Sequence, residues 1–134
     1  MILADTSIWI DYLRGQNEQL AQYVQNNQLA THLMVLGELA LGSFSNRKKL
    51  LKSCASLPLV SIANHESVME FIDEFGLMGK GIGWVDANLL VSVSQGSARL
   101  WTRDKRLKII AENLNLAHTT IESWGLSEGG DRNA

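Results

Sequence analysis

The chain has 134 residues, of which 46% are hydrophobic and 19% charged, and its formal net charge is −2. This length fits one domain, expected over residues 1–126, and the charge lacks the strongly basic balance of a typical nucleic-acid binder. The apolar runs are too short to span a bilayer and the single cysteine, Cys54, excludes an internal disulfide, so we expect a cytoplasmic protein with no membrane partner.

Strands are predicted to alternate with helices along the whole chain. A buried strand is expected over 1–5, and a helix capped by Thr6 or Ser7 follows over 8–14. Further helices are expected over 17–26, 34–42, 46–55, 64–75, 85–95 and 104–114, and further strands over 28–32, 57–62, 98–102 and 117–120. This alternation predicts an α/β fold with a mostly parallel central sheet, and the tail 127–134 is expected to be disordered.

Four carboxylates stand where apolar segments meet polar residues, at Asp5, Glu38, Asp86 and Asp104. An unpaired carboxylate beside a core is costly, because it loses hydration that nothing replaces. Four of them, far apart in sequence, indicate that they meet around a shared cation, and carboxylate oxygens suit Mg²⁺ or Mn²⁺. The pattern therefore predicts metal-assisted phosphate chemistry at the rim where parallel strands end.

Each of these acids also has a structural interpretation. Asp5 and Asp104 are suited to cap helices, and Asp86 lies in a first helical turn, where the helix dipole favours negative charge. Glu38 faces solvent if its helix is rotated, although apolar residues four before it and three after it share its face. Capping and metal binding remain open alternatives for the three aspartates.

Hydroxyl and basic side chains accompany the acids. Ser7 and Thr102 can orient a neighbouring carboxylate, and Ser7 is equally suited to cap the first helix. Arg103 and Arg106 are candidate contacts for RNA phosphates. Lys80 is a third candidate, in a glycine-rich loop that lacks the Gly-Lys-Ser/Thr ending of a phosphate-binding P-loop. Solvated surface charge is the alternative for all three basic residues.

Several of these segments together resemble a known family. The matching stretches are 3–14, 37–42, 81–90 and 100–107. In this order they are similar to PIN-domain ribonucleases, specifically the VapC-type toxins of VapBC toxin–antitoxin modules. The resemblance covers nearly the whole chain and implies a three-layer α/β/α sandwich with a mostly parallel central sheet.

The resemblance also implies a function. It implies a Mg²⁺- or Mn²⁺-dependent endoribonuclease that inhibits translation by hydrolysing structured RNA, such as transfer RNA or ribosomal RNA. It also implies a homodimer and a cognate antitoxin as protein partners. Promoter DNA is expected to be bound only through the antitoxin. The resemblance maps the catalytic and metal-binding acids and the supporting hydroxyls onto Asp5, Glu38, Asp86, Asp104, Ser7 and Thr102.

Two other functions fit part of the pattern. A phosphoacceptor signalling domain also clusters aspartates around Mg²⁺, but it needs a lysine at a strand end, and none is predicted here. A PIN-like module that binds RNA or a partner without cutting is the second alternative. Turnover that depends on a divalent metal would distinguish the enzyme from this binding module.

Overall fold

The computed structural model describes residues 1–119 of the chain. Within this range the strands are Ile2–Ala4 (β1), Leu29–Ala30 (β2) and Arg99–Trp101 (β3). The helices are Thr6–Leu13 (α1), Glu18–Gln25 (α2), Leu33–Ala40 (α3), Arg47–Ala55 (α4), His65–Glu74 (α5), Trp84–Gln95 (α6) and Lys105–Asn113 (α7). The predicted tail 127–134 lies outside the described residues, and the extent of the domain to residue 126 stays a prediction.

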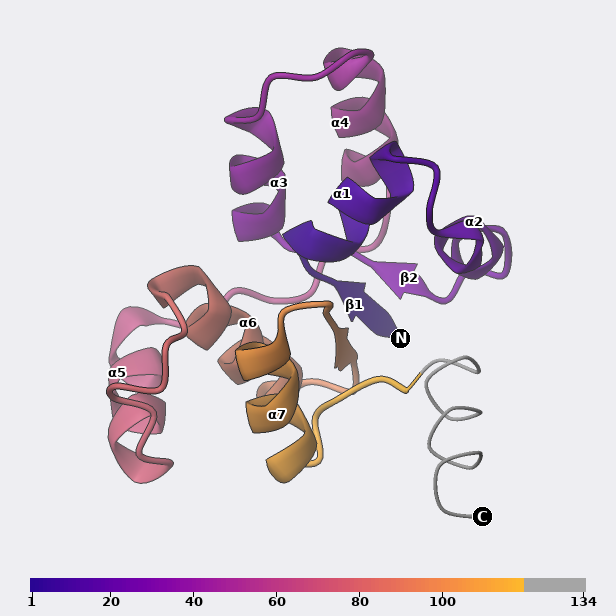
Figure 1. Cartoon of the computed structure of the whole chain (residues 1–134). Coiled ribbons are helices and arrows are strands. Elements are labelled where there is room, and N and C mark those ends of the chain that lie inside the picture. The colour runs from indigo at the N-terminus through magenta and orange to yellow at the C-terminus, as the bar shows by residue number, and fades with distance from the viewer. Residues whose placement is uncertain (120–134) are drawn as a thin grey trace.

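The strands form one parallel sheet in the order β2-β1-β3. Ile2 of the central strand pairs with Leu29 on one side and with Arg99 on the other. In Figure 1, α1 to α4 lie on one side of the strands and α5 to α7 on the other. This arrangement confirms the predicted α/β/α sandwich with a parallel central sheet. Because parallel strands end at the same edge, the residues after β1 and β3 become neighbours.

Two predicted strands are wrong in extent. Over 57–62 there is a single parallel bridge, between Thr31 and Leu59. In it the backbone N–H of Thr31 donates to the Pro58 carbonyl, and the Thr31 carbonyl accepts from the Val60 N–H, both at 2.8 Å. The next bond of a parallel ladder toward β2 would need an N–H on Pro58, which proline lacks. Over 117–120, the described part likewise contributes one bridge, between Leu100 and Ala117.

The hydrophobic core surrounds β1. Leu3 and Ala4 are fully buried, as are Ile8 of α1 and Leu90 of α6. Cys54 on α4 is also fully buried, where its Sγ lies 3.2 Å from the Thr31 hydroxyl. Helix α6 is buried along most of its length because it packs between the sheet and α5. No helix among residues 1–119 has the length and apolarity needed to cross a membrane.

Candidate active site

Asp5 follows β1 directly and is the N-cap of α1. Its Oδ1 accepts the Ile8 N–H at 3.3 Å and the Ser7 hydroxyl at 2.5 Å, and its Oδ2 accepts the Thr102 hydroxyl. The expectation that Thr6 or Ser7 caps this helix is therefore wrong. The Asp5 carboxylate itself reaches a free N–H of the first turn, and both hydroxyls bond to other side chains.

The pKa of the Asp5 carboxyl is raised above its ordinary value. Burial is the main cause, because only 5% of the residue is exposed and the charged form loses hydration. Hydrogen bonds from Ser7, Thr102 and the Ile8 N–H oppose this rise, and the negative charge of Asp86 adds to it. Asp5 is thus a buried carboxylate surrounded by donors, with another acid within electrostatic reach.

Two hydroxyls tie Asp5 to the end of β3. Ser7 Oγ accepts the Arg103 N–H at 2.9 Å, and Thr102 Oγ1 accepts the Asp104 N–H at 3.0 Å. Each hydroxyl has one proton, and each directs it to the Asp5 carboxylate. These contacts hold Asp5 as an acceptor and set the backbone at Asp104.

Glu38 lies on α3 and is exposed, although apolar residues share its face of the helix. These neighbours do not bury it, since Leu41 is itself 89% exposed. The Oε1 of Glu38 accepts the hydroxyl of Thr6 at 2.5 Å, across 32 positions of sequence. Sequence reasoning missed this role of Thr6, and its only local signal was a second hydroxyl beside Asp5.

Asp86 is the third residue of α6 and is partly buried. Its Oδ2 accepts the Gly83 N–H at 3.3 Å, which is half of a capping box, because Gly83 has no side chain to complete the other half. Burial raises the pKa of Asp86, the Gly83 N–H opposes this, and the charges of Asp104 and Glu38 raise it further. Asp86 is therefore within electrostatic reach of Asp5, Glu38 and Asp104.

Asp104 is the N-cap of α7, and its Oδ1 accepts the Leu107 N–H at 3.0 Å. The capping alternative thus holds for Asp104, Asp86 and Asp5, yet all three also face the same region. The edge formed by β1, β3, α3 and α6 brings the four predicted acids into one group. We call this group the acidic cluster: Asp5, Glu38, Asp86 and Asp104.

Among residues 1–119, the acidic cluster has no basic partner. The ion pair found within residues 1–119 joins Arg103 Nη1 to Asp11 Oδ2 at 3.2 Å, outside the cluster. Like charges therefore repel one another there without compensation, which is the situation that a divalent cation relieves. Carboxylate and hydroxyl oxygens are the donors that Mg²⁺ and Mn²⁺ prefer, so the residues present fit such an ion chemically.

The side chains of the cluster are not arranged as a finished coordination shell. Among residues 1–119, no group of three or more His, Cys, Asp or Glu side chains is placed to hold a metal ion. Instead the oxygens accept hydrogen bonds from hydroxyls and from helix N-termini. A cation bound here would require the carboxylates to turn toward it.

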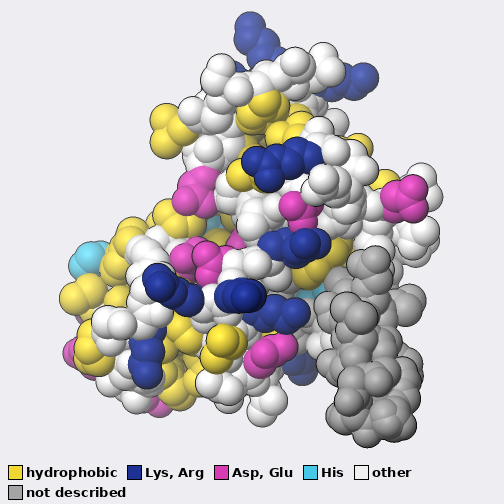
Figure 2. Space-filling model, in the orientation of Figure 1, with side chains coloured by type: hydrophobic (Ala, Val, Ile, Leu, Met, Phe, Trp, Pro, Cys, Tyr) yellow, Lys and Arg dark blue, Asp and Glu magenta, His cyan; other side chains and the backbone are white. Residues whose placement is uncertain are grey.

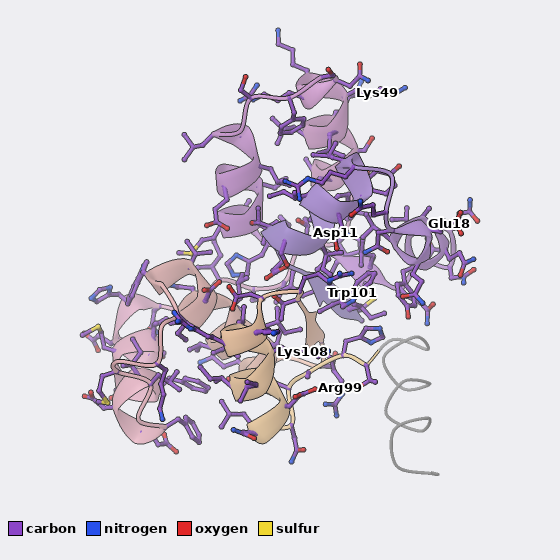
Figure 3. All side chains as sticks on the ribbon, in the orientation of Figure 1. Asp11, Glu18, Lys49, Arg99, Trp101 and Lys108 are labelled. Atoms are coloured by element: carbon purple, nitrogen blue, oxygen red, sulfur yellow. The ribbon has the colours of Figure 1, made fainter. Side chains whose placement is uncertain are left out.

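Of the predicted phosphate contacts, Arg103 and Arg106 lie within two residues of Asp104 in the chain. Arg103 reaches α1, where it contacts the buried Asp11 Oδ2, an atom with no hydrogen bond of suitable geometry in the described part. Figure 3 shows Asp11 on α1 close to the end of β3 that carries Trp101. Lys80 and Arg106 are exposed. In Figure 2, basic side chains surround acidic ones on this face of the molecule.

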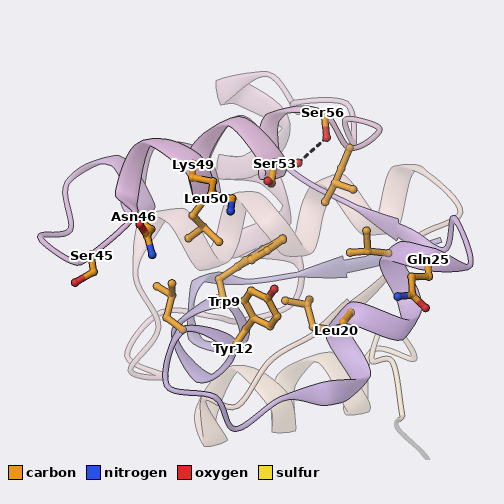
Figure 4. Close-up of a pocket in the computed structure, with 14 residues that line it drawn as sticks. Trp9, Tyr12, Leu20, Gln25, Ser45, Asn46, Lys49, Leu50, Ser53 and Ser56 are labelled. Carbon is orange, nitrogen blue, oxygen red and sulfur yellow. Dashed lines mark hydrogen bonds between the residues drawn. The ribbon is translucent and has the colours of Figure 1, made fainter.

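A separate groove lies between α1, α2 and α4 (Figure 4). Its walls are mainly apolar, and it contains no member of the acidic cluster. Trp9 lines it and is 3% exposed, and the indole Nε1 has no acceptor among the described residues. Its lining includes Trp9, Tyr12, Leu20, Val24, Lys49 and Leu50.

Comparison with known proteins identifies relatives. No protein-family model matches the chain. The chain is 45% identical over 109 residues to "Ribonuclease VapC32" of Mycobacterium tuberculosis, in strains CDC 1551 and H37Rv alike, covering 81% of this chain and 88% of the relative. The crystal structure of PAE2754 from Pyrobaculum aerophilum superposes with a TM-score of 0.59 at 18% identity, over 84% of this chain and 90% of that one. At that identity the structural likeness supports the fold alone.

Proposed function

The chain belongs to the VapC-type PIN-domain ribonucleases, and we propose that it is the toxin of a type II toxin–antitoxin module that inhibits translation by cutting RNA with a divalent metal. The observation that carries this proposal is the acidic cluster. Four carboxylates come from distant parts of the chain, Asp86 lies within electrostatic reach of each of the other three, and all four lack a basic partner among residues 1–119. Such an arrangement is unfavourable in an apo protein and useful to one that binds a cation.

In this proposal Asp5, Glu38, Asp86 and Asp104 hold Mg²⁺ or Mn²⁺. The bound ion supplies Lewis acidity and lowers the pKa of water, which is the chemistry that phosphodiester hydrolysis needs. Ser7 and Thr102 keep Asp5 oriented, and Thr6 does the same for Glu38. Lys80, Arg103 and Arg106 bind phosphates beside the cluster.

The reaction is a hydrolysis at phosphorus. The oxygen of a water molecule bonds to phosphorus, its proton passes to a carboxylate of the acidic cluster, and the phosphorus–oxygen bond to the leaving nucleotide breaks. The departing oxygen is then protonated. The same carboxyl can return to that oxygen the proton that it took from water, so the step balances. The substrate is a structured RNA, such as transfer RNA or ribosomal RNA.

Cleavage of total cellular RNA by the purified, antitoxin-free protein tests this function. We expect discrete cuts with Mg²⁺ or Mn²⁺, none with EDTA, and none with the Asp5→Asn variant. Asp73→Asn, which changes an exposed carboxylate on α5 outside the cluster, should cut normally. Full activity of Asp5→Asn would refute the assignment, and absence of cutting by folded protein with metal bound would favour the non-cutting binding module.

The groove between α1, α2 and α4 is the surface that we assign to the antitoxin. Its apolar walls suit the apolar face of a partner segment, and Lys49 on the basic helix α4 favours acidic side chains beside that face. The buried Trp9 Nε1 would gain an acceptor from the partner. Because α1 carries both Trp9 and, at its N-cap, Asp5, a partner seated here can extend over the active site.

Two matched variants test this surface. Val24→Asp places a charge at an exposed position of the groove, and Ile109→Asp does so on α7, away from it. We expect Val24→Asp to weaken the complex with the cognate antitoxin about tenfold or more, whereas Ile109→Asp should not. RNA cleavage should persist in both variants. Equal antitoxin affinity in the two would contradict this placement.

The proposal also includes a homodimer in the cytoplasm, where translation takes place. Exposed apolar side chains of Leu33, Leu41 and Leu59 provide surface that a second copy can cover. Light scattering of the antitoxin-free protein should give the mass of two chains. A monomer across the micromolar range would contradict this part of the proposal. Promoter DNA is expected to bind only when the antitoxin is present.

A further inference from the structure

The glycine-rich loop before α6 contacts the start of α7, where Gly81 of the loop lies against Arg106 of the helix. Gly81 has a φ of +81°, and a Cβ added there would lie 2.6 Å from Arg106 Nη1, 2.7 Å from its Cδ and 3.1 Å from its Cζ. Both the aliphatic stem and the guanidinium of Arg106 therefore lie against the backbone of Gly81. Any side chain at this position would displace the arginine from the loop.

Arg106 packs against Gly81, yet among residues 1–119 its guanidinium N–H groups have no acceptor. In the described part of the chain its side chain makes no hydrogen bond and no ion pair, whereas the side chains of Arg47, Arg99 and Arg103 each have an acceptor. A long exposed side chain loses considerable conformational entropy when it must be ordered by a ligand. Contact with the Gly81 backbone removes part of that loss in advance, while the N–H groups stay available.

The contact lies next to the acidic cluster. Gly81 comes five residues before Asp86, and Arg106 comes two residues after Asp104. Within residues 1–119, Arg106 forms an ion pair with neither Asp104 nor Asp86. An unpaired guanidinium two residues after Asp104 in the chain is available to a phosphate bound beside the cluster.

We propose that Gly81 is a positioning residue that seats Arg106 against the loop, so that the Arg106 guanidinium binds an RNA phosphate adjoining the one that is cut. This inference rests on the proposed ribonuclease function and adds a residue to its substrate site. A planar guanidinium can donate two parallel hydrogen bonds to a phosphate. An arginine that is already oriented for this geometry binds the phosphate more tightly than a mobile one.

The loop offers a matched control for Gly81. Gly79 also has a positive φ, +71°, but an added Cβ there meets no atom within 4 Å. Alanine at either position introduces the same kind of backbone strain, because both glycines are in the left-handed region. Only Gly81→Ala should move Arg106, so the two variants should melt within about 2 °C of each other and differ in RNA binding.

The experiment measures binding of fluorescently labelled bulk transfer RNA in EDTA, by anisotropy, at several KCl concentrations. We expect Arg106→Ala to weaken binding about three- to tenfold at 0.1 M KCl and to lower the slope of log Kd against log salt by about 0.7 to 0.9, the loss of one phosphate contact. Gly81→Ala should reproduce most of both changes, and Gly79→Ala neither. The double variant Gly81→Ala, Arg106→Ala should bind as Arg106→Ala does, because both changes remove the same contact.

Two results would overturn this inference while the ribonuclease proposal stands. One is equal RNA affinity and salt slope for Gly81→Ala and Gly79→Ala. The other is unchanged binding by Arg106→Ala. In either case metal-dependent cutting by the wild-type protein, lost in Asp5→Asn, would show that the enzyme assignment holds. Failure of the wild-type protein both to bind and to cut RNA would instead refute the proposed function, and this inference with it.

Discussion

Replacing Asp86 by asparagine should stabilise the metal-free protein while abolishing its activity. Asp86 is partly buried, and the negative charges of Asp104 and Glu38 act on it. Asparagine keeps an oxygen that can accept the Gly83 N–H, so the helix start is preserved. The substitution therefore removes a repelling charge and leaves the hydrogen bond that Asp86 makes to the backbone.

The size of this effect follows from the surroundings of Asp86. Each like charge at short range near a surface costs a few tenths of a kcal/mol, and partial loss of hydration adds a comparable amount. Solvent screens both contributions, because the side chain is only partly buried. The sum is about 1 kcal/mol, which for a domain of this size is a rise in Tm of about 2–5 °C.

The pH dependence of this gain has a definite sign. Burial and neighbouring acids raise the pKa of Asp86 in the folded state, so the folded protein binds this proton more tightly than the unfolded chain does. The wild-type protein is therefore penalised above the raised pKa and recovers as pH falls. The advantage of Asp86→Asn should be complete at pH 7 and should disappear toward about pH 4, the ordinary value for an aspartate.

Thermal unfolding followed by circular dichroism in EDTA, at pH 7 and pH 4.5, measures this difference. Addition of Mg²⁺ should stabilise the wild-type protein by mass action and stabilise Asp86→Asn less. The difference between the two Tm values should therefore become smaller or change sign. Asp73→Asn, at an exposed site, is the control and should match wild type throughout. A Tm of Asp86→Asn equal to or below that of wild type in EDTA at pH 7 would refute the reasoning.

Three further predictions concern the groups that support the fold and the cluster. Thr6→Val removes the donor to Glu38 and should weaken Mg²⁺ binding about tenfold in a metal titration, while Thr6→Ser should retain it and Tm should stay within about 2 °C. Thr102→Val leaves the Asp104 N–H without its acceptor and removes one of the three donors to Asp5, and should cost about 2 kcal/mol in urea unfolding. Burial lowers the pKa of His32, so wild type should lose stability as pH falls below about 6.5, a dependence that His32→Asn should remove while keeping the cap on Met34 N–H.

Much of the fold could be read from local patterns. Helix caps at Asn17 and Asn64 stand where the sequence predicts helices to begin, and each accepts an N–H of the first turn. The short strands β1 and β3 also match their apolar segments. The prediction was wrong over 57–62, where one proline prevents a longer ladder, since pairing depends on the partner strand as well as on local propensity.

The acidic cluster was predicted as four residues, and its surroundings were not. The sequence indicated that Asp5, Glu38, Asp86 and Asp104 are placed beside apolar segments, but it did not decide whether Glu38 is buried or, as the structure shows, exposed. It also did not reveal that Asp5 is the cap of α1, because three neighbouring polar residues compete for that role and only their distances decide among them.

The sequence by itself determined the α/β class, the parallel sheet and the identity of the candidate acids, because apolar periodicity and misplaced charge are local properties that survive without a partner. Tertiary structure alone decided which side chains meet. Thr6 donates to Glu38 across 32 positions, Thr102 donates to Asp5 across 97, and Arg106 lies on Gly81. These contacts depend on where the parallel strands end and how the helices pack against them, and a one-dimensional pattern does not contain those distances.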